Sequence, residues 1–248
     1  MFDVTGARQL LRRGETASSY LGDTITSIVT TTVSDDNLTG LSLDDELRIL
    51  AEFEPDFYLP ADAPTYTLDE PEERIASIQQ SMTGTRWLAE QIDQQGIGTQ
   101  LIPLIKGVTP PERAIYYEMV ETIDAMQCGF YASQYFGGRA GVQKDQLVCD
   151  LDRIDGELDA AGRDHELLVV GVLAPQTLKR LPDRVTAAAG LQVWRSEVSP
   201  RAQSEAVIRE RYAILADLIE SALASSDDDQ DGNGKQEATE RDTDGSGT

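Results

Sequence analysis

Several carboxylates of this chain lie at or beside the ends of apolar runs, where a fold could gather them. Asp62 ends the run DFYLPAD, Asp35 follows TSIVTTTV, and Glu197 lies within LQVWRSEV. Nucleophilic catalysis by a carboxylate needs one group that attacks the substrate and a second that manages the proton, held close together on different strands. We therefore name Asp62, with Asp35 or Glu197, as candidate catalytic residues. In so acidic a chain these side chains could instead be solvated or cap the next helix.

A lysine, a glutamine and a glycine-rich segment offer groups that could bind a substrate. Lys106 ends the run QLIPLIKG, where its ammonium could pair with an anionic substrate or with one of the chain's many carboxylates. The segment GGRAG contains Gly137, Gly138 and Arg139, whose amides and guanidinium could meet a phosphate or a base, although turn geometry alone also explains it. Strand alternation over CGFYASQYF would point Gln134 into the interior of a barrel.

The cysteine and histidine content gives little support for a metal or redox site. Two cysteines, Cys128 and Cys149, and one histidine, His165, are too few for a disulfide scaffold or a Cys/His metal site. Both cysteines are expected to be small buried apolar residues, and His165 to be a loop residue and not a general base. We expect no bound metal and no cofactor.

The charge of the chain is large and unusual in kind. It has 21 Lys and Arg against 44 Asp and Glu, a formal charge of −23, and its basic residues divide into 4 lysines and 17 arginines. Lysine avoidance with an excess of acid is typical of a halophilic protein, whose carboxylates hold water and cations in concentrated salt, and the alternative is an ordinary acidic mesophilic protein. Such a charge disfavours nucleic-acid binding at low salt. The sequence lacks a long apolar run and a leader-type N-terminus, so we expect a cytoplasmic protein without a membrane partner.

Apolar periodicity divides the chain into alternating strand and helix candidates, the pattern of βα units with a mainly parallel sheet. Six strand candidates can be traced, at residues 26–33, 56–62, 100–107, 128–136, 166–173 and 191–198. The intervening stretches are expected to be helical, including one that opens at Pro175. Six units fit a reduced (β/α) barrel of the TIM-barrel type, with an open doubly wound parallel sheet as the alternative. In either fold the chemistry belongs at the carboxyl ends of the strands.

A change of composition near residue 225 divides the chain into a body and a tail. Residues 226–248 contain eight acidic and two basic residues and no large apolar side chain. They cannot bury enough surface to offset the entropy of ordering the chain. We expect residues 1–225 to form one barrel-like domain and residues 226–248 to be a disordered acidic tail.

The order of several short segments resembles the tRNA-guanine transglycosylase family. An Asp-rich turn is followed by FYLPAD, TRWLAEQ, PLIKG, FGGRAG and VVGVLAPQTLKRLPDRV, over about residues 26–200. The resemblance implies a modified β/α barrel that exchanges a guanine base in a polynucleotide for a deazapurine, a tRNA modification, using an aspartate nucleophile at a late strand. By position, Asp62 would read the purine edge, Gly137 and Gly138 would contact the base, and GVLAP would form the glycine-rich turn near the fifth strand unit.

The sequence departs from that family at the positions that do chemistry. The segment VWRSEVSPR has no aspartate, which leaves Glu197 for the nucleophile; the family's cysteine and histidine zinc ligands are absent, and Lys106 stands where a glutamine is common. Three functions stay open. The first is a transglycosylase-like enzyme that acts on a purine-like small molecule, with tRNA or DNA as a partner at high salt. The second is a catalytically degenerate relative that serves as a binding or accessory protein. The third is another β/α-barrel enzyme that acts on an anionic metabolite, with Lys106 and Arg139 at its centre.

The acidic composition predicts a strong dependence of stability on salt. Self-repulsion among the carboxylates is screened to a Debye length of about 3 Å at 1 M salt and acts over a longer range in dilute buffer. We therefore expect the melting temperature to fall steeply as KCl is removed. Thermal unfolding between dilute buffer and molar KCl checks this, and a flat salt dependence would contradict the halophilic interpretation.

Overall fold

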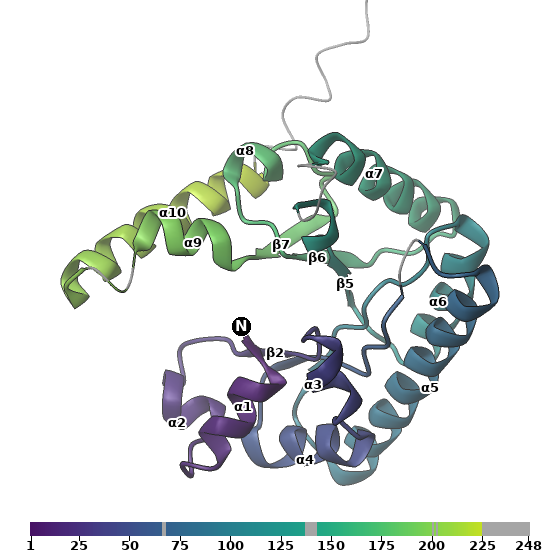
Figure 1. Ribbon diagram of the computed structural model, residues 1–248, viewed down its shortest axis with the longest axis horizontal. Helices are drawn as coiled ribbons and strands as arrows, with labels where there is room; N and C mark the ends of the chain where they lie inside the picture. Colours follow the sequence, from purple (N-terminus) through teal and green to yellow (C-terminus); the bar gives the residue numbers. More distant parts are fainter. Residues whose placement is uncertain (66–67, 137–142, 200, 202, 225–248) are drawn as a thin grey trace, which may run out of the picture.

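The computed structural model describes residues 1–65, 68–136, 143–199, 201 and 203–224 (Figure 1). Gly137, Gly138, Arg139 and the tail predicted at 226–248 lie outside these ranges. The elements in chain order are β1 (Phe2–Asp3), α1 (Val4–Leu11), α2 (Ala17–Leu21), β2 (Ile28–Thr30), α3 (Asp35–Thr39), α4 (Leu43–Phe53), β3 (Phe57–Leu59), α5 (Pro71–Gln95), β4 (Gln100–Leu101), α6 (Pro110–Thr122), β5 (Gln127–Tyr131), the 3-10 helix η1 (Ser133–Phe136), α7 (Lys144–Ala160), β6 (Glu166–Val170), α8 (Pro175–Leu178), β7 (Val185–Ala189), α9 (Leu191–Val198) and α10 (Glu205–Ala224).

All pairings between these strands are parallel, and the strands lie in the order of the sequence. One sheet has the order β1-β2-β3-β4, and a second has the order β5-β6-β7. A bridge between Leu104 and Gly129 links the two sheets, with the Ile105 amide donating to the Gly129 carbonyl at 2.7 Å. The protein is therefore an α/β fold with parallel sheets. Among the strands that the structure describes, β7 does not pair with β1, so no closed sheet forms.

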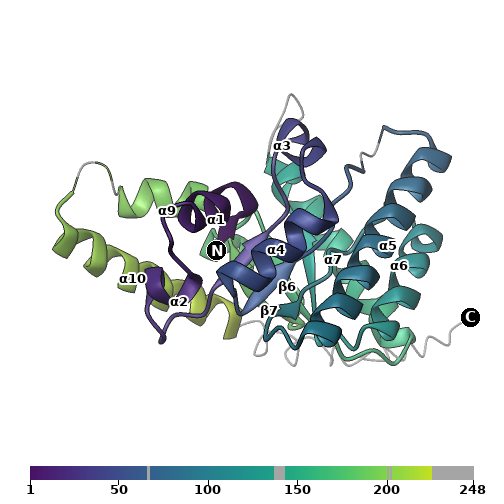
Figure 2. The ribbon, with the colours of Figure 1, turned by 90° about the horizontal axis from the view of Figure 1, so that it is seen from below.

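The helices cover the outside of the strands, and an apolar core fills the space between the two sheets. Figures 1 and 2 show α5 and α6 side by side along one flank, with α9 and α10 on the opposite side. Five buried side chains from both sheets and the segment after β4 meet in the inner core: Leu59, Ile102, Leu104, Leu168 and Val170. Their contacts hold the two sheets together beyond the single bridge. Among the described residues, no helix is long and apolar enough to cross a bilayer.

Local sequence signals explain where several helices begin and end. The Ser42 hydroxyl accepts the Asp45 amide at 3.2 Å, and the Asp45 carboxylate accepts the Ser42 amide at 3.3 Å, so Ser42 is the N-cap of α4. Proline lies in the first turn of α5, α6 and α8. Helix α5 ends at Gly96, whose φ of 64° is the left-handed conformation that favours glycine.

Five of the six predicted strands form close to where they were expected, although each is shorter. The segments 26–33, 56–62, 100–107 and 166–173 contain β2, β3, β4 and β6, and β5 overlaps the segment 128–136. The sixth prediction is wrong, because residues 191–198 form helix α9 and the strand lies earlier, at β7. The β7 sequence VTAAA has few of the bulky residues that mark a strand, and pairing with β6 stabilises it. Strand β1 was not predicted.

Helix α5 approaches the turn after β3 closely at Gly84. A Cβ atom at Gly84 would lie 2.8 Å from the Ala61 Cβ and 3.0 Å from the Leu43 Cδ2. The Ala61 Cβ belongs to a turn whose backbone is constrained, because Ala61 has a φ of 47°, so this atom cannot easily move aside. Only glycine therefore lets α5 pack at this distance.

We expect Gly84→Ala to destabilise the protein, although alanine is the better helix former. The added methyl group has no space, and overpacking of this kind costs about 1 to 3 kcal/mol. Gly156→Ala in α7 is the matched control, because a Cβ there meets no atom within 4 Å. That change should stabilise the protein by up to about 1 kcal/mol. Chemical denaturation of both variants checks the pair, and equal effects would contradict the close packing.

Candidate functional site

An ion pair joins two of the sequence-predicted residues at the carboxyl ends of neighbouring strands. The Lys106 ammonium, which follows β4, donates to the Asp62 Oδ1, which follows β3, and donates also to the Ala63 carbonyl at 2.7 Å. The side chains of Lys106 and Asp62 are 11% and 15% exposed. The pair is thus largely withdrawn from water but still reaches the surface.

Thr31 fixes the backbone at Asp62. Its hydroxyl donates to the Leu59 carbonyl at 2.9 Å and accepts the Asp62 amide at 3.1 Å, while its own amide donates to the same Leu59 carbonyl at 3.1 Å. Thr31 is fully buried at the end of β2. The ends of β2 and β3 are therefore tied together directly beneath the ion pair.

Glu46, on α4, supports the same turn from within the core. It is 3% exposed, and its Oε2 accepts the Ala61 amide at 2.9 Å. Ala61 has a φ of 47°, in the left-handed region that non-glycine residues rarely occupy. The pKa of Glu46 is raised to about 7, mainly by burial and in smaller part by the nearby Asp62 charge, while the Ala61 hydrogen bond opposes the shift.

Two more polar side chains lie close to the Glu46 carboxyl group. The Tyr58 hydroxyl is buried without a hydrogen bond of normal geometry among the described residues, and burial followed by the charge of Glu46 raises the pKa of Tyr58 well above its ordinary value. Arg8, from α1, lowers the pKa of Glu46 by its charge and forms an ion pair with Asp45 at 2.9 Å. The carboxyl group of Glu46 thus shares its environment with a phenol and a cation.

Sequence reasoning missed Glu46, although a signal for it was present. The apolar positions of α4 are Leu43, Leu47, Leu50 and Phe53, and Glu46 lies three residues after the first and four before the third. A charged residue at a position that faces the core must be neutralised or hydrogen-bonded. That pattern marks Glu46 as a buried acid.

Buried ion pairs brace the segment that carries Lys106. Arg74 of α5 pairs with Glu112 of α6 at 2.8 Å, and Glu112 also accepts the Val108 amide at 2.7 Å, two residues after Lys106. Although burial raises the pKa of Glu112, the hydrogen bonds from Arg74 and Val108 bring it below its ordinary value. Arg113 then joins α6 to Glu157 of α7 at 2.6 Å.

Two of the other predicted site residues, Glu197 and Gln134, do not join this cluster. Glu197 is exposed on α9 and therefore does not stand at a strand end, which corrects the expectation for the last βα unit. Gln134 is exposed on η1, because β5 ends at Tyr131 and the strand alternation stops there. Asp35 is the first residue of α3, and its side chain lies outside the part of the chain that the structure describes. Strand β7 ends on Ala189, so it offers no carboxylate at its end.

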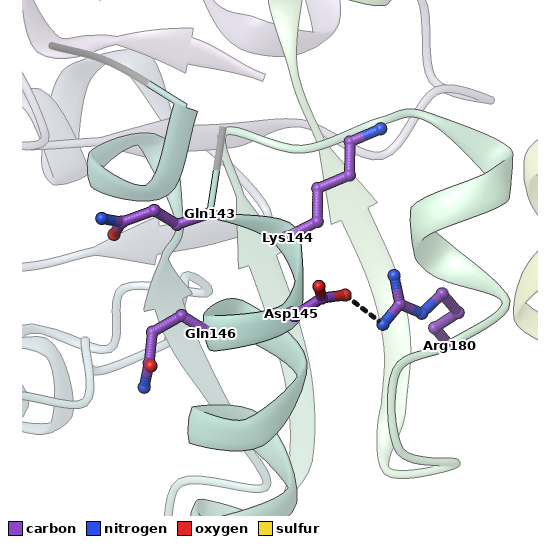
Figure 3. A pocket seen from close by; sticks show the side chains of 5 residues that line it. All are labelled: Gln143, Lys144, Asp145, Gln146 and Arg180. Atoms are coloured by element: carbon purple, nitrogen blue, oxygen red, sulfur yellow. Dashed lines mark hydrogen bonds and ion pairs between the residues drawn. The ribbon is translucent and has the colours of Figure 1, made fainter. Parts of the chain in front are cut away.

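A polar depression lies at the N-terminus of α7 (Figure 3), and neither Asp62 nor Lys106 lines it. Its volume is about 640 Å³, and its lining residues are Gln143, Lys144, Asp145, Gln146 and Arg180. Arg180 pairs with Asp145 at 2.6 Å, whereas the Lys144 side chain extends away from that pair in Figure 3. The depression is therefore polar and only weakly cationic.

The cysteines and the histidine divide between burial and exposure. Cys128 is buried, as predicted, and burial raises the pKa of its thiol to about 11; Cys149 is exposed on α7, so that part of the prediction is wrong. His165 lies in the loop before β6, and its Nε2 is buried without a hydrogen bond among the described residues. No group of three or more His, Cys, Asp or Glu in the described ranges could hold a metal ion.

Comparison with known proteins adds no family. No protein-family model matches the chain, and no curated protein matches it. The geometry at Asp62 and Lys106 is therefore the basis for assigning a function.

The raised pKa of Glu46 predicts how stability depends on pH. The folded state binds the Glu46 proton more tightly than the unfolded chain, so this contribution is complete below about pH 4.5 and is lost as the pH rises through 7. Glu46→Gln keeps a neutral group at all pH values. We expect the variant to gain about 2.5 kcal/mol relative to wild type between pH 5 and pH 8. Unfolding free energies at both pH values check this, and parallel profiles would contradict it.

Proposed function

We propose that this chain is a reduced, open (β/α) barrel that binds a guanine-type base at the carboxyl ends of β3 and β4 without exchanging it. The barrel part is supported by the sequential order of the parallel strands and by the inner core that both sheets share. The binding part is supported by the Asp62–Lys106 pair. The proposal corresponds to a degenerate relative of the tRNA-guanine transglycosylases.

The observation that carries the proposal is the set of hydrogen-bonding groups left open by the ion pair. Among the described residues, the Asp62 Oδ2 accepts no hydrogen bond, and Lys106 uses two of its three donors, on Asp62 and the Ala63 carbonyl. The pair therefore presents an acceptor beside a donor. Guanine presents the complementary groups on one edge, an amino donor and the O6 acceptor. Adenine carries no O6 acceptor, and the pair should discriminate against it.

The positions of the described carboxylates support binding without exchange. Asp62 is paired with a cation, Glu197 is exposed on α9, and β7 ends on an alanine. A nucleophile needs a free electron pair aimed at the anomeric carbon and a second group within reach of the proton. The described residues offer no such couple, so recognition is the better conclusion. At a net charge of −23 a free base or nucleoside is the first ligand, with tRNA or DNA limited to high salt.

An anionic metabolite is the second candidate, and the depression at the start of α7 favours it. Lys144 and Arg180 line that depression, but Asp145 neutralises Arg180. Lys106 is also neutralised, by Asp62. Among the described residues, neither the depression nor the Asp62–Lys106 pair therefore offers much uncompensated positive charge for binding an anion.

Equilibrium dialysis of labelled guanine and adenine in molar KCl tests the proposal. We expect wild type to bind guanine in preference to adenine, and Asp62→Asn to weaken guanine binding at least about tenfold, because a hydrogen bond to a charged acceptor contributes about 1.5 to 3 kcal/mol. Glu118→Gln, an exposed change on α6, is the matched control and should bind as wild type does.

Three outcomes would overturn the proposal. Equal guanine binding by wild type and Asp62→Asn would remove the site, provided that thermal unfolding shows both to be folded. Binding of inorganic phosphate in place of guanine would favour the anionic metabolite. Incorporation of labelled guanine into tRNA would show that exchange does occur.

A further inference from the structure

We propose that Glu46 is a positioning residue, whose ionised carboxylate holds the Ala61–Asp62 turn in the conformation that binds the base, so that binding strengthens as the pH rises through neutrality. The inference rests on the proposed function, because it concerns the same site. Glu46 does not contact the ligand. It affects the position of Asp62 through the backbone of the Ala61–Asp62 turn.

The turn has an unfavourable backbone conformation that something must hold in place. Ala61 lies at a φ of 47°, and the next residue is Asp62. The Glu46 Oε2 accepts the Ala61 amide at 2.9 Å, while Gly84 leaves space for the Ala61 methyl group on the side of α5. A rotation of Ala61 towards ordinary φ values would break this hydrogen bond and move the Asp62 carboxylate away from Lys106.

The charged and titratable groups around Glu46 come from five places. Tyr58 lies on β3, Arg8 on α1 and Asp62 on the turn itself, and Lys106 after β4 pairs with Asp62. From α4, Asp45 pairs with Arg8. Burial is the largest influence on the carboxyl group and raises its pKa to about 7, so both protonation states are populated near neutral pH.

The two protonation states differ in how firmly they hold the turn. A carboxylate accepts an amide hydrogen bond roughly twice as strongly as a neutral group does. The ionised form therefore favours the left-handed Ala61, and the neutral form releases it. If the ionised fraction rises from about 0.1 at pH 6 to about 0.9 at pH 8, the apparent affinity rises by about tenfold, because apparent affinity scales with the competent fraction.

Stability and binding should then change in opposite directions, which separates positioning from a structural role. The ionised carboxylate is the less stable state in the buried site, yet it is the state that holds Asp62 for the ligand. A variant that is permanently neutral should be more stable and bind less well. A residue that served only to support the fold would weaken binding only as it weakened the fold.

The first experiment follows the Ala61 amide in the full chain, in molar KCl, by nitrogen-15 NMR between pH 5.5 and 8.5. We expect its shift to titrate near neutrality in wild type and to stay flat in Glu46→Gln. Glu52→Gln, an exposed change on the same helix, should titrate as wild type does. A flat Ala61 shift in wild type, or an unchanged titration in Glu46→Gln, would overturn the inference.

The second experiment measures guanine affinity of the same variants at pH 6 and pH 8. We expect a rise of about tenfold for wild type and Glu52→Gln and a change below about twofold for Glu46→Gln, with the variant near the weak, low-pH value. Equal pH dependence in all three would overturn the inference. If wild type binds no guanine at either pH, the proposed function fails, and the Ala61 titration alone decides whether Glu46 positions the turn.

Discussion

The parallel pairing of β2, β3 and β4 is the constraint on which the candidate site depends. Parallel strands that are neighbours end at one edge, so the residues that follow them lie close together however far apart they are in the sequence. Thr31, Asp62 and Lys106 follow these three strands, and hydrogen bonds join them in series. The backbone brings the two side chains together, so forming the ion pair costs only the conformational entropy of the Asp62 and Lys106 side chains.

Ion pairs with buried arginines also fix the positions of the helices relative to one another. Removing one partner of a buried pair leaves an unpaired charge, so such pairs fix geometry more effectively than they add stability. Arg74 with Glu112 joins α5 to α6, and Arg113 with Glu157 joins α6 to α7. The Glu112 carboxylate also accepts the Val108 amide, so the ion pairs that join the helices also hold the segment that carries Lys106 in place. In a chain so rich in acid, every one of these inward-facing arginines finds a carboxylate.

Much of the fold could be predicted from the sequence where its hydrophobic pattern was strong, and the parallel sheet then placed Asp62 beside Lys106. The sequence misled where the pattern was weak. The alanine-rich β7 depends on its pairing with β6, and the apolar residues of 191–198 fit a helix as well as a strand. The apolar spacing of α4 marks Glu46 as a buried acid, but its role was missed, because that role depends on the backbone of Ala61, fifteen residues away.

The pairing of Asp62 with Lys106 also bears on how a site can work in concentrated salt. A lone, partly buried carboxylate in molar KCl would attract a potassium ion, which a neutral ligand would then have to displace. The Lys106 ammonium occupies that position permanently, and its link to the Ala63 carbonyl holds it there. The neutralised pair keeps an open acceptor and a spare donor without attracting mobile cations. Under the proposed function, such a site favours a neutral ligand with complementary hydrogen bonds, because pairing with Lys106 offsets the charge with which Asp62 would attract a cation or act as a nucleophile.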